Sequence, residues 1–151
     1  MQTLYWEDFA AGQSYELGSR TLERDAILAF AREYDPQPFH TDEAAARQSI
    51  YGGLIASGWQ TGSLYMRMLY DGLIHRTAGM GSPGLDELRW LAPVRPSDTL
   101  TVRFFIEDTR PSQSKPDRGL IMTRGEVWNQ DGVQVLRLRA TMMIRRRPAD
   151  A

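Results

Sequence analysis

Residues 59–73 read WQTGSLYMRMLYDGL, and their apolar side chains recur at helical spacing. The apolar and small residues form a broad stripe of Trp59, Gly62, Ser63, Met66, Leu69, Tyr70 and Leu73. Leu64 and Met68 add apolar character outside the stripe. A helix that is apolar over so much of its circumference is expected to be central and buried. We therefore interpret the stripe as core, with Gly62 and Ser63 letting another backbone come close.

Downstream of this helix the apolar pattern switches to alternation, which is typical of strands. The alternating sets are Leu88, Trp90 and Ala92, then Leu100, Val102, Phe104 and Ile106, and finally Leu136, Leu138, Ala140, Met142 and Ile144. Another strand is expected over residues 120–129, and Asp131-Gly132 indicates a hairpin turn after it. Residues 93–98 predict a turn, and the polar residues 108–118 predict an exposed loop. Helices followed by long strands predict an α+β fold, in which an antiparallel sheet packs on the apolar helix.

Upstream, a short strand is expected around residues 14–20, followed by an amphipathic helix. Thr21 is the expected cap of this helix, with acidic residues in its first turn. The helix is expected to end at Asp35, because Pro36 disfavours helical geometry in the residue before it. A further short helix is expected over residues 42–47. Asp42 is interpreted as the start of that helix rather than as a catalytic residue.

Between these helices lies the segment YDPQPFHTD, residues 34–42. Two prolines fix the backbone, so we expect a stiff, extended loop without a helix. Asp35 and His40 lie five residues apart on this loop, and rigid loops that display an acid and an imidazole can carry proton transfer. At a helix C-terminus the macrodipole is expected to raise the pKa of Asp35 and make it a proton donor. The alternative interpretation is a proline-rich loop with an incidental histidine.

A glycine-rich segment, YGGLIASG at residues 51–58, leads into the central helix. Free amides at a helix N-terminus can stabilise a developing oxyanion, and Gly58 has no side chain to block its amide. The segment is not a phosphate-binding loop, because no Gly-Lys-Ser/Thr follows it.

Composition excludes several classes of function. The 151 residues, 42% apolar with a net charge of -1, predict a single domain over residues 1–151. Near-neutral charge argues against a nucleic-acid partner. The absence of cysteine excludes disulfides and thiolate chemistry, and His40 and His75 are too few for a multi-histidine metal site. No leader or apolar run of membrane-spanning length is apparent, so a cytoplasmic location is expected. His75 is expected at the surface near a helix end.

Three motifs together resemble the MaoC-like dehydratases, which include the (R)-specific enoyl-CoA hydratases. They are Asp-Pro-Gln-Pro-Phe-His-Thr-Asp, Ile-Ala-Ser-Gly at the helix entry, and Ala-Pro-Val-Arg-Pro-Ser-Asp-Thr-Leu after a strand. The resemblance covers residues 15–147. It implies the hotdog fold, a long antiparallel sheet wrapped around a central helix. It also implies dimers, with an acyl-thioester tunnel near the interface.

The resemblance places the catalytic acid–base pair of the family on Asp35 and His40, and the oxyanion glycine on Gly58. Gln37 stands where the family usually has Asn, Ser57 where it commonly has His, and Met66 where some hydratases have Ser. Together with Gly58, Ser57 and Gln37 are expected to bind the substrate. No metal or cofactor is expected.

The leading hypothesis is therefore an acyl-CoA hydratase/dehydratase that adds water to a 2-enoyl thioester and gives an (R)-3-hydroxyacyl product. The expected partner is an acyl-CoA or acyl-carrier-protein thioester, and the expected assembly is a homodimer or higher homo-oligomer. One alternative is a hotdog thioesterase, with Asp35 activating water. Another is a non-catalytic subunit that binds acyl-CoA or supports a partner. A metal site on His40-Thr41-Asp42 lacks a third ligand.

Overall fold

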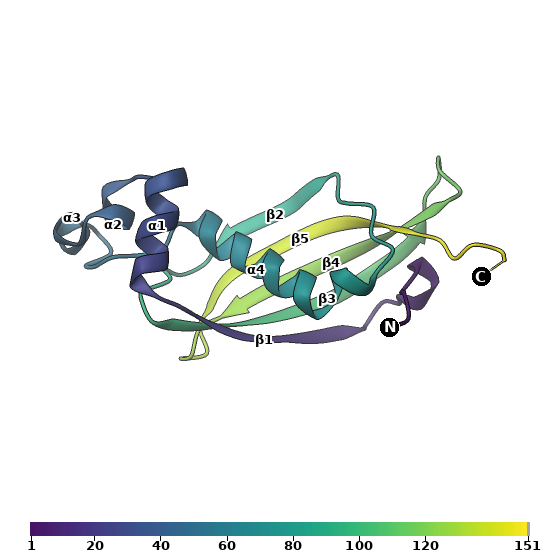
Figure 1. Ribbon diagram of the computed structural model, residues 1–151, viewed down its shortest axis with the longest axis horizontal. Helices are drawn as coiled ribbons and strands as arrows, with labels where there is room; N and C mark the ends of the chain where they lie inside the picture. The colour runs from purple at the N-terminus through teal and green to yellow at the C-terminus, as the bar shows by residue number, and fades with distance from the viewer. Residues whose placement is uncertain (151) are drawn as a thin grey trace.

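The computed structural model describes residues 1–150, which form a five-stranded antiparallel sheet with one long helix across its face (Figure 1). The strand order is β1-β3-β4-β5-β2, so β1 and β2 are the edge strands. The strands are β1 (Ser14–Leu22), β2 (Gly84–Trp90), β3 (Asp98–Pro111), β4 (Arg118–Trp128) and β5 (Gln134–Arg145). The α+β prediction is confirmed, as is the hairpin at Asp131-Gly132, where Gly132 has a φ of 72°.

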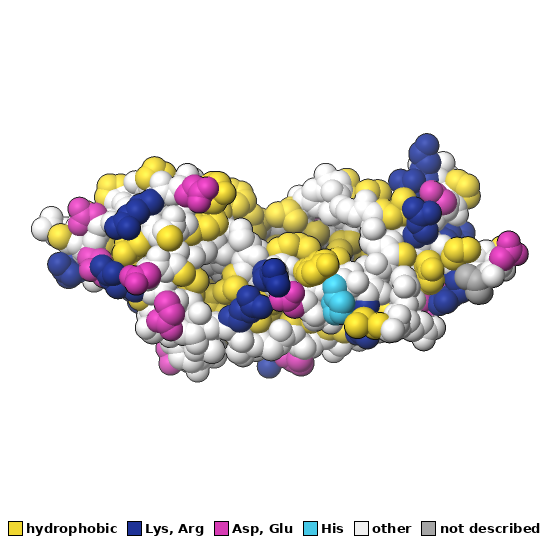
Figure 2. Space-filling view, viewed as in Figure 1, with side chains coloured by type: hydrophobic (Ala, Val, Ile, Leu, Met, Phe, Trp, Pro, Cys, Tyr) yellow, Lys and Arg dark blue, Asp and Glu magenta, His cyan; other side chains and the backbone are white. Residues whose placement is uncertain are grey.

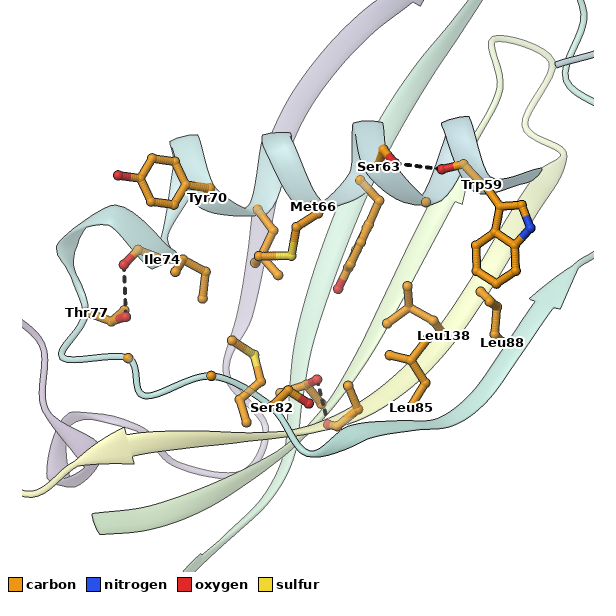
Figure 3. A pocket seen from close by; sticks show the side chains of 18 of the residues that line it. Trp59, Ser63, Met66, Tyr70, Ile74, Thr77, Ser82, Leu85, Leu88 and Leu138 are labelled. Carbon is orange, nitrogen blue, oxygen red and sulfur yellow. Dashed lines mark hydrogen bonds between the residues drawn. The ribbon is translucent and has the colours of Figure 1, made fainter. Parts of the chain in front are cut away.

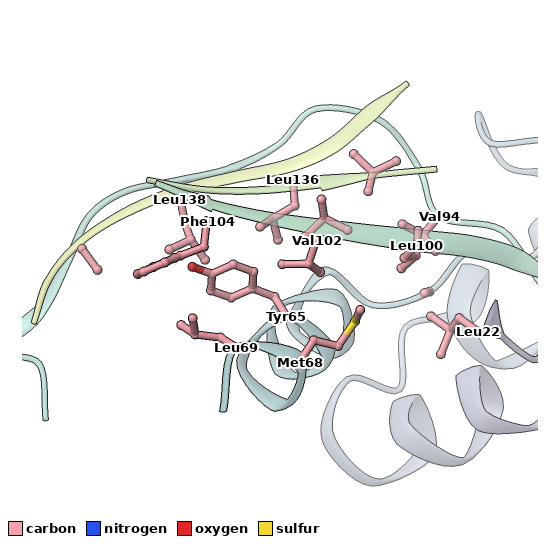
Figure 4. Packing of buried hydrophobic residues seen from close by; sticks show 14 of the residues in the cluster. Leu22, Tyr65, Met68, Leu69, Val94, Leu100, Val102, Phe104, Leu136 and Leu138 are labelled. Atoms are coloured by element: carbon pink, nitrogen blue, oxygen red, sulfur yellow. The ribbon is translucent and has the colours of Figure 1, made fainter. Parts of the chain in front are cut away.

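The central helix α4 (Gly58–Gly72) packs one of its faces against the sheet and forms the core (Figure 4). Tyr65, Met68 and Leu69 of α4 are buried against Val102, Phe104, Leu136 and Leu138 of the sheet. The Tyr65 ring lies so close to Gly125 of β4 that a side chain at that position would overlap it. Strict alternation of buried and less buried residues in β3 from Asp98 to Ile106 confirms the period of two expected for residues 100–106.

The predicted core stripe of α4 is partly wrong. Leu69 and Leu73 are buried, but Trp59, Met66 and Tyr70 are 58%, 45% and 49% exposed. These side chains point away from the core, into a groove beside the helix. The error arises because a core and an open apolar groove leave the same hydrophobic signature in a sequence.

Three short helices lie together at the N-terminal end of α4 (Figure 1). They are α1 (Arg24–Tyr34), α2 (Pro38–Thr41) and α3 (Glu43–Gln48), and two 3₁₀ turns, η1 (Trp6–Asp8) and η2 (Ile74–Arg76), complete the elements. Asp42 caps α3 as predicted, because its Oδ1 accepts hydrogen bonds from the amides of Ala44 and Ala45 at 2.9 and 3.1 Å.

Three boundary predictions are wrong. Thr21 belongs to β1, where its hydroxyl bonds that of Thr99, and Glu23 precedes α1 instead. The segment around His40 is not wholly extended, because Pro38 occupies the first position of α2, where a missing amide proton costs nothing. β3 continues to Pro111, so the predicted loop 108–118 is shorter than expected.

Candidate active site

Asp35 and His40 are brought together by the turn between α1 and α2. Asp35 is the C-cap of α1, and its amide donates to the carbonyl of Ala31 at 2.9 Å. Pro36 prevents the helix from continuing, and α2 then carries His40 back toward the carboxylate. Oδ2 of Asp35 and Nε2 of His40 are 3.3 Å apart, and their side chains are only 17% and 6% exposed.

The His40 ring is fixed in position by the residues that precede α4. Its Nδ1 donates to the carbonyl oxygen of Ile55 at 2.7 Å, which places a proton on that nitrogen because a carbonyl can only accept. The amide of Ile55 in turn donates to the carbonyl of Phe39 at 3.1 Å. The second ring nitrogen, Nε2, is therefore the one that faces Asp35 and can exchange a proton there.

Two further side chains hold the carboxylate of Asp35. Gln37 Nε2 donates to Oδ1 at 2.7 Å, and the hydroxyl of Ser57 donates to Oδ2 at 2.8 Å. Ser57 is fully buried and is also the N-cap of α4, since its Oγ accepts from the amide of Trp59 at 3.3 Å. Both residues donate to Asp35 in the structure, and their expected contact with the substrate stays a prediction.

This arrangement contradicts the raised pKa expected for Asp35. Burial disfavours the charged form, but hydrogen bonds from Gln37 and Ser57, together with the charge of His40 when it is protonated, lower the pKa of Asp35 below its ordinary value. Asp35 is therefore an ionised carboxylate at neutral pH.

Gly58, Asp35, Gln37 and His40 line one cavity of about 500 Å³. Gly58 is the first residue of α4, and within residues 1–150 its amide donates to no protein group. That free N–H, at the positive end of a helix dipole, is a suitable donor for an oxygen that gains negative charge.

Other walls of this cavity come from residues that were not themselves predicted to be site residues from the sequence. These are Tyr51, Thr61, Trp90 and Leu91, together with residues 92–94. Val94 lies within the Ala-Pro-Val-Arg motif, so the motif carried a signal for it. Trp90 carried none beyond its place in an alternating strand.

A second, larger cavity of about 730 Å³ runs beside α4 as an apolar groove between this helix and β2. In Figure 2 hydrophobic side chains gather in the hollow over this part of the molecule. Figure 3 shows Trp59 near one end and Ile74 and Thr77 near the other, with Leu85 and Leu88 facing the helix from β2. This groove is where the exposed half of the predicted core stripe points.

His75 is exposed near the end of α4, as predicted, and its Nδ1 lies 2.9 Å from the carbonyl of Tyr70. Among residues 1–150, no three histidine, aspartate or glutamate side chains group closely enough to hold a metal ion. In that same range, no helix has the length and hydropathy of a membrane-spanning segment.

Comparison with known proteins identifies the family. The model of the MaoC like domain matches residues 8–121. A MaoC-like dehydratase structure from Rhodospirillum rubrum is 42% identical, with a TM-score of 0.88, over 96% of this chain and 99% of that one. A structure named monoamine oxidase regulatory protein, from Archaeoglobus fulgius, is 27% identical, with a TM-score of 0.89, over 98% of each chain. The (R)-specific enoyl-CoA hydratase of Rhodospirillum rubrum is 30% identical over 115 residues, 72% of this chain and 74% of that protein.

The family match covers more than half of the chain, so this protein belongs to the MaoC-like dehydratase family. The resemblance drawn from the three sequence motifs is thereby confirmed. The five-stranded antiparallel sheet packed on α4 is the hotdog fold that this resemblance implied.

Proposed function

We propose that this protein is an acyl-thioester hydratase/dehydratase that reversibly adds water to a 2-enoyl thioester. The observation that supports this most strongly is the contact between Asp35 and His40, 3.3 Å apart, in a cavity that also contains Gly58. The relative named as an (R)-specific enoyl-CoA hydratase supports the same reaction class.

In the proposed mechanism, the Asp35–His40 pair removes a proton from water and returns it to the substrate. The remaining hydroxyl forms a C–O bond at C3 of the enoyl group as the C2–C3 double bond opens. The proton then passes from the pair to C2, so water is consumed and the pair regains its starting state. Because Asp35 is ionised at the outset, it need not begin as the acid that the sequence analysis expected.

Gly58 is proposed to stabilise the enolate that forms during this addition. Negative charge develops on the thioester oxygen as C3 is attacked, and the free amide at the start of α4 can donate to that oxygen. Gln37 and Ser57 are proposed to orient Asp35 through their hydrogen bonds. A substrate in this cavity would have both reacting groups on one side, which favours syn addition, and the family resemblance implies the (R)-3-hydroxyacyl product.

The proposal is tested with a panel of 2-enoyl-CoA substrates of increasing length. Loss of the conjugated-enone absorbance without release of free thiol is the expected result, with Asp35→Asn as the inactive control. Thiol release from saturated acyl-CoA would indicate a thioesterase instead. Binding of acyl-CoA without turnover of any panel member, as either CoA or carrier-protein thioester, would indicate a non-catalytic subunit.

We further propose that the protein is a homodimer. Within the described residues 1–150, β2 pairs only with β5, so its other edge has free backbone donors and acceptors there. Leu85 and Trp90 on this strand, and Met66 on α4, leave a contiguous apolar surface around the groove. A second copy that pairs along β2 would cover both the edge and the open side of the groove.

A further inference from the structure

The active-site cavity and the apolar groove share only three residues among those that line them, namely Gly58, Trp59 and Trp90. The two spaces are therefore neighbours on either side of one wall. No Asp, Glu, Lys or Arg within residues 1–150 lines the groove, whereas the smaller cavity contains the Asp35–His40 pair. A wall of two indoles thus separates a space suited to chemistry from a space suited to hydrocarbon.

Trp90 is the part of this wall that lies against Gly58. Its indole lies so close to the Cα of Gly58 that a methyl group there would overlap the ring. The Trp59 ring supports it in an edge-to-face contact, with centroids 5.2 Å apart and an interplanar angle of 80°. Trp90 stands at the end of the edge strand β2 and is 45% exposed, so its ring is not locked by the core.

This geometry limits the acyl group if the proposed function holds. A thioester oxygen bound by Gly58 brings C2 and C3 beside Asp35 and His40, inside the cavity of about 500 Å³. That space must also admit part of the thiol arm of the substrate. The apolar groove would accept a long hydrocarbon tail, but the Trp90 indole stands between the groove and the reacting carbons.

We propose that Trp90 is a specificity-determining residue that restricts the substrate to short acyl groups, with the groove as an extension closed off by its indole. This inference rests on the proposed function, and it names the substrate class of that same site. Removing the indole should connect the two spaces and admit longer chains. Each methylene that then becomes buried is expected to favour binding by about fourfold.

The test compares wild type, Trp90→Ala and the double variant Trp90→Ala/Gly62→Leu. Gly62 lines the groove but not the active-site cavity. A Cβ atom at this position would meet no other atom within 4 Å, so a leucine there is expected to fill the groove without a backbone clash. The ratio of kcat/KM for 2-decenoyl-CoA to that for 2-butenoyl-CoA is expected to rise at least about tenfold in Trp90→Ala. The added leucine is expected to cancel most of that rise.

Calorimetric affinities for saturated butanoyl-CoA and decanoyl-CoA provide a readout that does not depend on turnover. Trp90→Ala is expected to increase the affinity for decanoyl-CoA relative to the affinity for butanoyl-CoA. The double variant is expected to reverse this increase. An unchanged ratio of affinities in a folded Trp90→Ala protein would overturn the inference, as would an equal gain in the double variant. Failure of the proposed function would look different, because wild type would then hydrate no enoyl-CoA whatever the affinities.

Discussion

At the scale of single residues, the site depends on a carboxylate held by several donors. Asp35 accepts from Gln37 and Ser57 and lies against His40, so its charge and its orientation are set together. The sequence singled out Asp35 and His40 as an acid and an imidazole on one proline-bounded segment, but it predicted an extended loop, and it is helix α2 that brings the two side chains together. It could not supply the sign of the pKa shift, since Ser57 lies 22 positions away and reaches Asp35 only in the folded chain.

Loss of either member of the pair should remove most of the turnover. Asp35→Asn and His40→Gln are each expected to lower kcat by at least ~10²-fold, the lower end for acid–base catalysis, with a small change in KM. Because the two groups act as a unit, the double variant should be little worse than the single ones. Steady-state kinetics with 2-butenoyl-CoA measures this. Near-normal kcat in either single variant would exclude the assignment.

The pKa of Asp35 should depend on the hydroxyl of Ser57. The folded-state pKa is lowered, so the stability it contributes is present above the unfolded value and is lost as pH falls through the folded value. In a ¹³C NMR titration of wild type, the Asp35 carboxyl is expected to titrate below the ordinary value of about 3.9. Ser57→Ala should move it upward, and Ser57→Thr should largely restore it. A carboxyl that titrates identically in all three proteins would contradict this account.

At the scale of elements, alternation made the sheet predictable and the two faces of α4 made the helix ambiguous. Every second residue of β3 from Asp98 to Ile106 is buried, so its alternating sequence can be interpreted only as a strand with one buried face. By contrast, α4 has two apolar faces. Tyr65 and Met68 pack in the core, whereas Met66 and Tyr70 line the groove. Both environments select apolar residues, so hydrophobicity alone cannot separate them.

Neighbouring residues of β3 should therefore differ sharply in their effect on stability. Phe104 is fully buried, and Phe104→Ala is expected to lower the free energy of unfolding by about 3–5 kcal/mol. The adjacent Phe105 faces away from the core beneath the Arg124 guanidinium, so Phe105→Ala should cost clearly less. Urea unfolding followed by circular dichroism measures both. Equal losses would mean that the two faces of β3 are not distinct in packing.

At the scale of the whole molecule, a monomer leaves the free edge of β2 and the groove beside it uncovered. Their existence could not be predicted from the sequence, because it depends on the strand order, which places β2 beyond β5. Five strands are apparent in the residue pattern, but which of them become edges is decided by pairings between distant segments.

Assembly should be sensitive to charge on this face. Leu85 is 52% exposed on β2, and Leu85→Glu is expected to convert the proposed dimer to a monomer by placing a charge in an apolar contact. Val133 is 44% exposed in the hairpin between β4 and β5, and Val133→Glu should leave the dimer intact. Light scattering after gel filtration distinguishes the two results. A monomeric wild type, or a dimer that survives Leu85→Glu, would remove the case for this interface.

Ser57 takes part in two structures at once, as the cap of α4 and as a donor to Asp35. A chain whose first α4 turn has frayed therefore loses, in the same event, a bond that orients the Asp35 carboxylate and lowers its pKa. The free energy of ordering the first turn of α4 is thus linked to the free energy of ionising Asp35. Mild heating that unwinds this turn is therefore expected to lower the proposed hydratase activity while the sheet still keeps its shape.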